Sequence, residues 1–172
     1  MKKTLAILCG ILFGTIVGFG QKFAFVDTEY ILKNIPGYKA AQEKIDKLSE
    51  QWQKEVEDIY KEVEKMDKDY QAEKVLLSEQ LRQKREDEIL AKEKEARELQ
   101  KKYFGSTGEL FKKREELVKP IQDEVYKAIK EMAVEGNYTA IFDSAGGSAT
   151  ILYSDPKADK SDAVLQKLGY KN

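Results

Sequence analysis

The sequence predicts a mostly α-helical chain with a small β body, from which a long antiparallel helical hairpin, a coiled-coil arm, projects. Residues 38–75 contain no glycine or proline and repeat an apolar seam every seven residues, as a two-helix coiled coil requires. β-prone runs stand only near the two ends of the remaining chain. Four glutamates spaced seven residues apart in residues 43–68 are each followed four positions later by a lysine, the favourable order on an exposed helix face. These pairs are Glu43–Lys47, Glu50–Lys54, Glu57–Lys61 and Glu64–Lys68.

The first twenty residues form a separate segment. Lys2 and Lys3 precede an apolar run from Thr4 to Val17, and Gly18-Phe19-Gly20 supplies small residues before Gln21. This pattern predicts a signal peptide over residues 1–20, cleaved before Gln21, and therefore an exported chain. An uncleaved membrane anchor is the alternative, disfavoured because the run is short and broken by glycine.

Composition excludes several kinds of site. The chain has no histidine, and its single cysteine, Cys9, lies in the signal peptide, so Ser–His and Cys–His pairs and histidine metal sites are absent. Loss of Lys2 and Lys3 with that peptide leaves 28 basic and 31 acidic residues, a net charge of −3. Nucleic-acid-binding proteins are usually basic. We expect no enzyme activity, no catalytic residue, no metal, no cofactor and no nucleic acid.

The mature chain opens with a short strand at residues 23–27, followed by a short helix over residues 28–35 that Pro36-Gly37 ends. Residues 21–37 are thus expected to form the first part of the body. The arm is expected to occupy residues 38–135. Its first helix runs to about Val75.

A turn near residues 76–79 is expected to reverse the chain, because Ser78 is a good N-cap and Glu79 suits a first helical turn. The return helix then runs from Glu79 to about Phe104. Facing residues should have numbers that sum to about 155, which pairs Trp52 with Tyr103, Val56 with Leu99, Ile59 with Ala96, Met66 with Ile89 and Ile45 with Leu110. The predicted arm seam comprises Ile45, Trp52, Val56, Ile59, Val63, Met66, Leu99 and Tyr103. The alternative, one continuous helix over residues 38–104, would leave both apolar stripes in need of other chains.

The return arm is interrupted and then rejoins the body. A break is expected at Gly105–Gly108, and a helical pattern resumes over residues 109–134, with a kink or restart at Pro120. Residues 136–172 should complete the body. They contain β-prone runs at 138–143 and 149–153, predicted to form a hairpin, and a last helix that Asp159 or Ser161 can cap and Gly169 closes.

Three short strands and a small helix bury little apolar surface, and small isolated sheets are marginal in water. We therefore expect several chains to complete one β body. The residues expected to form this oligomeric body are Phe23, Phe25, Ile141, Phe142, Ile151 and Leu152.

An apolar cluster stands at the far end of the arm, next to the highly charged stretch 82–88. Its members are Val75, Leu76, Leu77 and Leu81. Packing within the hairpin turn is one interpretation. The other is an exposed surface that contacts a client protein.

An exported chain with Phe23-Ala24-Phe25-Val26-Asp27 at its start, a charged helical hairpin, and then the 138–143 and 149–153 runs resembles the Skp (OmpH) family. The resemblance covers nearly the whole mature chain. It implies a homotrimeric, ATP-independent holdase chaperone in the periplasm of a Gram-negative bacterium. Such a chaperone holds unfolded outer-membrane β-barrel proteins in the cavity between three helical arms and prevents their aggregation.

One departure from the family is charge. Well-known members are strongly basic, whereas this mature chain is mildly acidic, and it shows no basic cluster that matches a lipopolysaccharide site. No lipopolysaccharide site is therefore carried over, and the sequence leaves open whether the chain contacts membrane or lipopolysaccharide. A coiled-coil structural or adaptor protein of the cell envelope, binding one folded partner, is the alternative function.

Overall fold

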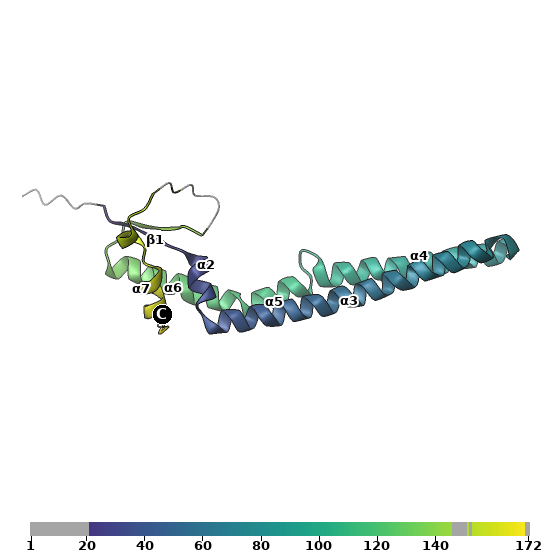
Figure 1. The fold of residues 1–172 in the computed structure, drawn as a ribbon, viewed down its shortest axis with the longest axis horizontal. Coiled ribbons are helices and arrows are strands. Elements are labelled where there is room, and N and C mark those ends of the chain that lie inside the picture. The colour runs from purple at the N-terminus through teal and green to yellow at the C-terminus, as the bar shows by residue number, and fades with distance from the viewer. Residues whose placement is uncertain (1–20, 146–150, 152, 171–172) are drawn as a thin grey trace, which may run out of the picture.

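The computed structural model describes residues 21–145, 151 and 153–170, so the predicted signal peptide lies outside the described residues. Figure 1 shows a long helical arm projecting from a small body near the two ends of the chain. The predicted class, mostly helical with a small sheet and a long hairpin arm, is confirmed. The elements are β1 (Phe23–Val26), α2 (Thr28–Lys33), α3 (Pro36–Glu73), the 3₁₀ turn η1 (Lys74–Leu76), α4 (Glu79–Phe104), α5 (Glu109–Leu117), α6 (Lys119–Glu135), β2 (Ala140–Asp143), the 3₁₀ turn η2 (Pro156–Ala158) and α7 (Ser161–Lys167).

The junction between α2 and α3 differs from the expectation that Pro36-Gly37 ends the short helix. α2 already ends at Lys33, and Ile35 adopts an extended conformation as the N-cap of α3. Pro36 instead occupies the first turn of α3, where its fixed φ is favourable and its missing N–H leaves no bond unmade. α3 then continues for 38 residues without interruption, roughly 57 Å at 1.5 Å per residue.

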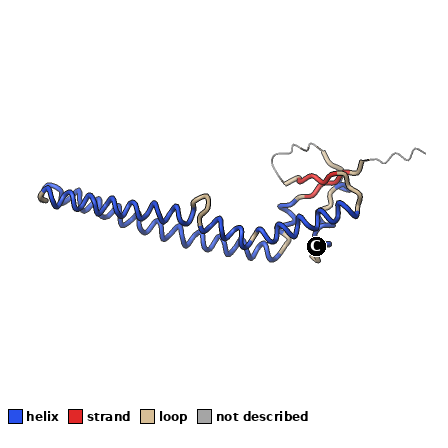
Figure 2. Tube along the Cα trace, turned by 180° about the vertical axis from the view of Figure 1, so that it is seen from behind, coloured by secondary structure: helices blue, strands red, loops and turns tan. Residues whose placement is uncertain are grey.

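α3 and α4 form an antiparallel hairpin, not one continuous helix (Figure 2). The Trp52 and Tyr103 rings, predicted to face each other, stack with their centroids 4.9 Å apart and their planes 8° from parallel. The Tyr103 hydroxyl donates to Glu55 at 2.6 Å, and Lys92 Nζ lies 2.9 Å from a Glu62 oxygen. These contacts set the register of the two helices.

The seam residues are covered to different degrees. Ile45, Val56 and Val63 are buried. The other predicted members are half-buried: Trp52, Ile59, Met66, Leu99 and Tyr103. Met66 packs, as the pairing rule expects, against the cluster that contains Ile89. Two helices alone leave the flanks of such a seam open to solvent, which accounts for the half-burial.

The body contains a two-stranded parallel sheet. β1 pairs with β2 in the register Phe23 to Ala140 through Val26 to Asp143. The expected hairpin between 138–143 and 149–153 is not observed among the described residues, since Ile151 and Tyr153 lie in no strand and residues 149, 150 and 152 lie outside them. Among the described residues, the strand that pairs with β2 is β1.

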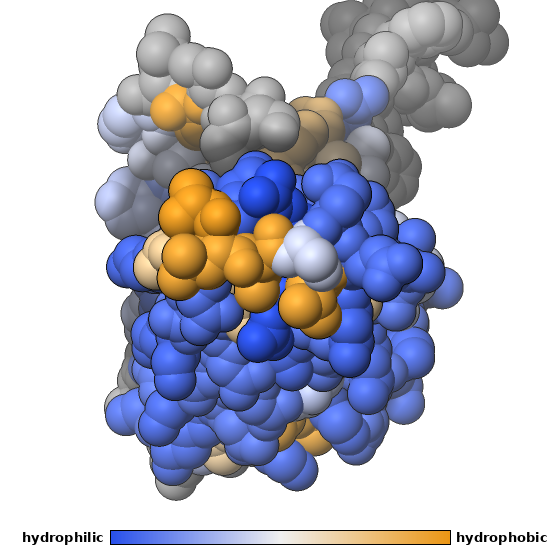
Figure 3. All heavy atoms as spheres, turned by 90° about the vertical axis from the view of Figure 1, so that its right-hand side faces the viewer, coloured by the Kyte–Doolittle hydropathy of each residue, from blue (hydrophilic) through white to orange (hydrophobic). Residues whose placement is uncertain are grey.

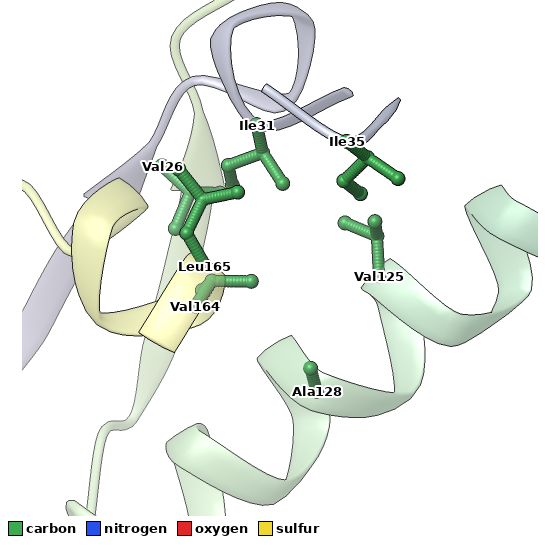
Figure 4. Close-up of a cluster of buried hydrophobic side chains, with 7 residues drawn as sticks. All are labelled: Val26, Ile31, Ile35, Val125, Ala128, Val164 and Leu165. Carbon is green, nitrogen blue, oxygen red and sulfur yellow. The ribbon is translucent and has the colours of Figure 1, made fainter. Parts of the chain in front are cut away.

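The body core joins segments from both ends of the chain. Its buried side chains, drawn in Figure 4, are Val26, Ile31, Ile35, Val125, Ala128, Val164 and Leu165. The Asp27 amide donates to the Ser161 hydroxyl at 2.8 Å, and the Ser161 amide donates to Asp159 at 2.9 Å. The expected cap at Asp159 or Ser161 was wrong, because Lys160 is the N-cap of α7 and its side chain makes no capping hydrogen bond. Asp159 precedes the N-cap and Ser161 is the first helical residue, and their hydrogen bonds link the end of β1 to the start of α7.

Replacement of Trp52 by Ala is expected to loosen the middle of the arm and to leave the body intact. Loss of the stack on Tyr103 should lower the free energy of unfolding of the arm by roughly 1–3 kcal/mol. Limited proteolysis should cut α3 and α4 faster near this position, while size-exclusion chromatography should show an unchanged oligomer. Trp52→Phe, which keeps an aromatic partner, is the control, and dissociation of the Ala variant into monomers would contradict the expectation.

Replacement of Leu165 by Ala is expected to destabilise the body. This side chain is almost fully buried, and truncating a buried leucine costs about 2–5 kcal/mol. Urea unfolding followed by circular dichroism measures the loss. Gln166→Ala, an exposed change on the same helix, should alter the unfolding midpoint little; equal effects of the two changes would show that Leu165 is not a core residue.

Candidate functional site

The tip of the arm is built from one turn of 3₁₀ helix followed by two extended residues. η1 ends at Leu76, Leu77 has φ −84° and ψ 143°, and Ser78 caps α4 by accepting from the Leu81 amide at 3.4 Å. Leu77 and Ser78 therefore reverse the chain in very few residues. The side chains beside this reversal differ in their surroundings. Some pack into the hairpin, and others face solvent.

Leu77 belongs to the hairpin itself. It is half-buried and packs against the cluster formed by Val63, Tyr70 and Ile89. Its carbonyl also accepts from Arg82 Nε at 3.2 Å. For this leucine the packing interpretation holds.

The other three apolar residues at the tip face solvent. Val75 is 81% exposed, Leu76 84% and Leu81 50%. Figure 3, which looks onto the end of the arm, shows hydrophobic surface gathered on an otherwise hydrophilic face. We call Val75, Leu76 and Leu81 the tip patch. Apolar groups left in water together, with charged groups around them, are a feature of contact surfaces.

Ion pairs border the tip patch and neutralise much of the local charge. Arg82 Nη1 lies 3.9 Å from Glu79, and Arg85 Nη1 lies 3.2 Å from Glu88. Such surface pairs contribute little to stability. Beside these paired charges, the tip exposes the three apolar side chains of the tip patch.

A polar contact across the hairpin holds the tip in place. Tyr70 is buried, and its hydroxyl donates to the Glu86 carboxylate on α4. This hydrogen bond raises the pKa of Tyr70 to about 12, because removing the proton would place two negative charges side by side. This hydrogen bond therefore links α3 to α4 near the tip patch.

The body presents a second apolar surface. Phe23, Phe25 and Phe142 lie on one face of the sheet, with ring centroids 6.1 Å apart for Phe23–Phe142 and 5.7 Å for Phe25–Phe142. Phe23 and Phe142 are each 45% exposed. The opposite face turns Ala24, Val26 and Ile141 toward the core.

The six residues expected to form an oligomeric body are therefore separated by the structure. Phe23, Phe25 and Phe142 form the open aromatic face, whereas Ile141 packs against the core of its own chain. Ile151 is half-buried outside any strand, and Leu152 lies outside the described residues.

Several exposed apolar residues escaped the sequence analysis, and Leu90 is an example on the arm. Leu90 is 57% exposed on the flank of α4, immediately after Ile89, which lies in the seam. The sequence could have predicted the exposure of Leu90 from the heptad phase. Adjacent helical positions are separated by about 100°, so Ile89 and Leu90 cannot both face α3.

Among the described residues, no group of three or more Cys, Asp or Glu side chains is placed to hold a metal ion. No described helix has the length and apolar character needed to cross a membrane. The surfaces that distinguish this chain are the tip patch and the aromatic face of the sheet, and both are suited to binding protein.

Residues 22–168 match the family described as Outer membrane protein (OmpH-like). A protein of Aquifex aeolicus (strain VF5), described only as uncharacterized, is 30% identical over 168 residues, covering 98% of this chain and 96% of its own. A crystal structure from Caulobacter crescentus CB15, titled as an OmpH-like outer membrane chaperone, superposes with a TM-score of 0.64 at 13% identity. That likeness in fold covers 86% of this chain and 83% of the other. The chain belongs to the OmpH-like family.

Proposed function

We propose that this OmpH-like chain is an ATP-independent holdase chaperone that binds unfolded outer-membrane β-barrel proteins between its helical arms and prevents their aggregation. The observation that carries the proposal is the tip patch, three solvent-facing apolar side chains at the end of a highly charged rod. An unfolded barrel protein exposes apolar faces and unpaired strand edges, so it offers matching surface.

Several arms acting together would hold such a client. The aromatic face of the two-stranded sheet supports assembly, because Phe23 and Phe142 are left half in water in a single chain. A homotrimer joined through this face, with three arms around a cavity, is the arrangement we propose. Each contact would be weak and reversible, and the linkage of the arms would supply avidity without a nucleotide cycle.

The proposed location is the periplasm of a Gram-negative bacterium. The basic start, apolar run and small residues of positions 1–20 support export by a cleaved signal peptide. A holdase there would meet its clients after their export and before their insertion in the outer membrane.

The function is tested by diluting a urea-unfolded outer-membrane barrel into the chain from Gln21 onward and recording mass by light scattering. The expected result is a soluble complex of several copies of this chain with one client. Bovine serum albumin at equal mass is the control for nonspecific protection. A client that aggregates as it does alone, beside an intact oligomer, would contradict the proposal and favour an envelope adaptor with one folded partner.

The tip patch is tested by a triple change of Val75, Leu76 and Leu81 to Ser. Burying one leucine contributes roughly 1.5–3 kcal/mol, so client dissociation should accelerate at least about tenfold, which corresponds to 1.4 kcal/mol. Dissociation of a labelled client into excess unlabelled chaperone gives the rate, and the oligomer mass should stay constant.

A matched variant distinguishes a specific effect of the tip patch on client dissociation from a general effect of removing exposed apolar side chains. Leu90→Ser with Val134→Ser removes two exposed apolar side chains, one on the arm flank and one in α6, and should leave client dissociation nearly unchanged. Leu77 is kept in both variants because it packs inside the hairpin. Equal rates for the tip variant and the unaltered chain would exclude the tip patch as a client contact.

A further inference from the structure

Gln21 directly follows the predicted cleavage site, so its chemistry changes if residues 1–20 are removed. The inference below rests on that part of the proposed function. Inside a chain, the side-chain amide of a glutamine has no amine next to it. At an amino terminus, the same amide lies within one residue of a nucleophilic α-amine, and closure gives a five-membered lactam. Reacting groups held this close react as if they were highly concentrated.

The surroundings of Gln21 allow such a ring to close. The residue is exposed, and no hydrogen bond or ion pair within the described part of the chain involves it. Neither the side-chain amide nor the backbone nitrogen therefore has to break a contact with these residues before the two meet. The terminal residue also lies outside β1, so ring closure leaves the strand pairing unchanged.

The residue after Gln21 is held in place. Lys22 Nζ donates to the Gly136 carbonyl at 3.0 Å and lies 4.3 Å from the centre of the Tyr138 ring. The Lys22 carbonyl accepts from the Thr139 amide at 2.7 Å. These contacts fasten the backbone to the turn between α6 and β2. A terminus at Gln21 would therefore stay at the surface of the body.

This position brings the terminal charge close to the aromatic face. Gln21 lies two residues before Phe23, and two residues span at most about 7 Å. Charges are screened over about 8 Å at physiological ionic strength, so the aromatic face lies within reach of the terminal charge. Phe23 is 45% exposed and belongs to the face through which copies are proposed to join. A terminal ammonium there would be partly desolvated when copies meet, which opposes their contact.

We propose that the newly exposed Gln21 cyclises to pyroglutamate, and that the loss of its terminal charge favours assembly through the aromatic face. The α-nitrogen attacks the side-chain carbonyl carbon and forms a new N–Cδ bond. The Cδ–Nε2 bond breaks, and Nε2 leaves as ammonia with a proton taken from the α-nitrogen. The step needs no oxidant, reductant or second substrate. An α-amine is mostly protonated at pH 7, whereas the lactam N–H is neutral.

Mass spectrometry tests the modification. The full chain, residues 1–172, is produced in the bacterium that encodes it, purified from the envelope and digested with glutamyl endopeptidase, which releases residues 21–29. Most of the terminal peptide should begin at Gln21, weigh one ammonia less than its sequence, and lose its first residue to pyroglutamyl aminopeptidase. A synthetic, isotope-labelled peptide of residues 21–29 passes through the same steps and measures any cyclisation caused by handling.

Gln21→Asn is the matched variant. Asparagine keeps the amide but is one methylene shorter, so it would have to close a strained four-membered ring. Its terminal peptide should keep a free amine and the mass of its sequence. In the unaltered chain, a terminal peptide cyclised no more than the labelled standard would overturn the proposal and leave export standing. A peptide that begins at another residue would overturn both the proposal and the predicted cleavage.

Dilution of the assembled chain tests the effect on assembly. The cyclised chain should dissociate at an about two- to fivefold lower concentration than the Gln21→Asn variant, the size expected for one surface charge. The difference should shrink in about 1 M salt, which screens charges beyond about 3 Å. Equal dissociation of the two chains at low salt, or no assembly of either, would overturn this half of the proposal.

Client protection is measured separately on the same two chains. A cyclised chain that assembles but leaves an unfolded barrel to aggregate would support the modification and remove the holdase proposal. A chain that protects the client with an uncyclised Gln21 would do the reverse.

Discussion

The apolar seam between α3 and the return helices is the interaction on which the rest of the molecule depends. Outside this seam the arm is almost entirely charged, and its ion pairs, such as Lys68–Glu64 at 2.5 Å, lie on solvated faces where they contribute little. Helices in proteins gain most of their stability from packing along one apolar face. The contacts of Val63, Tyr70 and Ile89 hold α4 against α3. They also fix the position of the turn that carries the tip patch.

The body depends on the same hairpin for its closure. β1 and β2 are separated by more than one hundred residues, and they meet because the arm leaves and re-enters the body at one end. The closure is then fixed by contacts specific to the body, including the Asp27–Ser161 hydrogen bond and the burial of Val164 and Leu165. The parallel sheet therefore depends on correct pairing of the arm helices, because this pairing brings two strands that are distant in sequence close together.

Features set by local chemistry were the ones that the sequence could predict. The cap at Ser78, the start of α4 at Glu79 and the break at Gly105 each follow from a few neighbouring residues, and the Trp52–Tyr103 partnership follows from counting back through the turn. The partner of β1 could not be predicted in this way, because strand pairing is non-local and residues 138–143 are compatible with several neighbours. The tip shows the same limit on a smaller scale. Leu76 and Leu77 are identical in hydropathy, and only the extended backbone at Leu77 turns one inward and leaves the other in water.

The tip patch and the aromatic face lie at opposite ends of the molecule, and the rod between them is mostly charged, with single apolar side chains such as Leu90 exposed on its flank. The aromatic face brings together three phenylalanine side chains of the sheet, so it suits a lasting contact between copies in the proposed assembly. The tip patch consists of three side chains beside a tight turn, so it suits a contact that forms and breaks. A rod roughly 57 Å long keeps these two kinds of contact apart. In the proposed function, that separation would allow a client to be bound and released at the tips while the proposed assembly at the body stays intact.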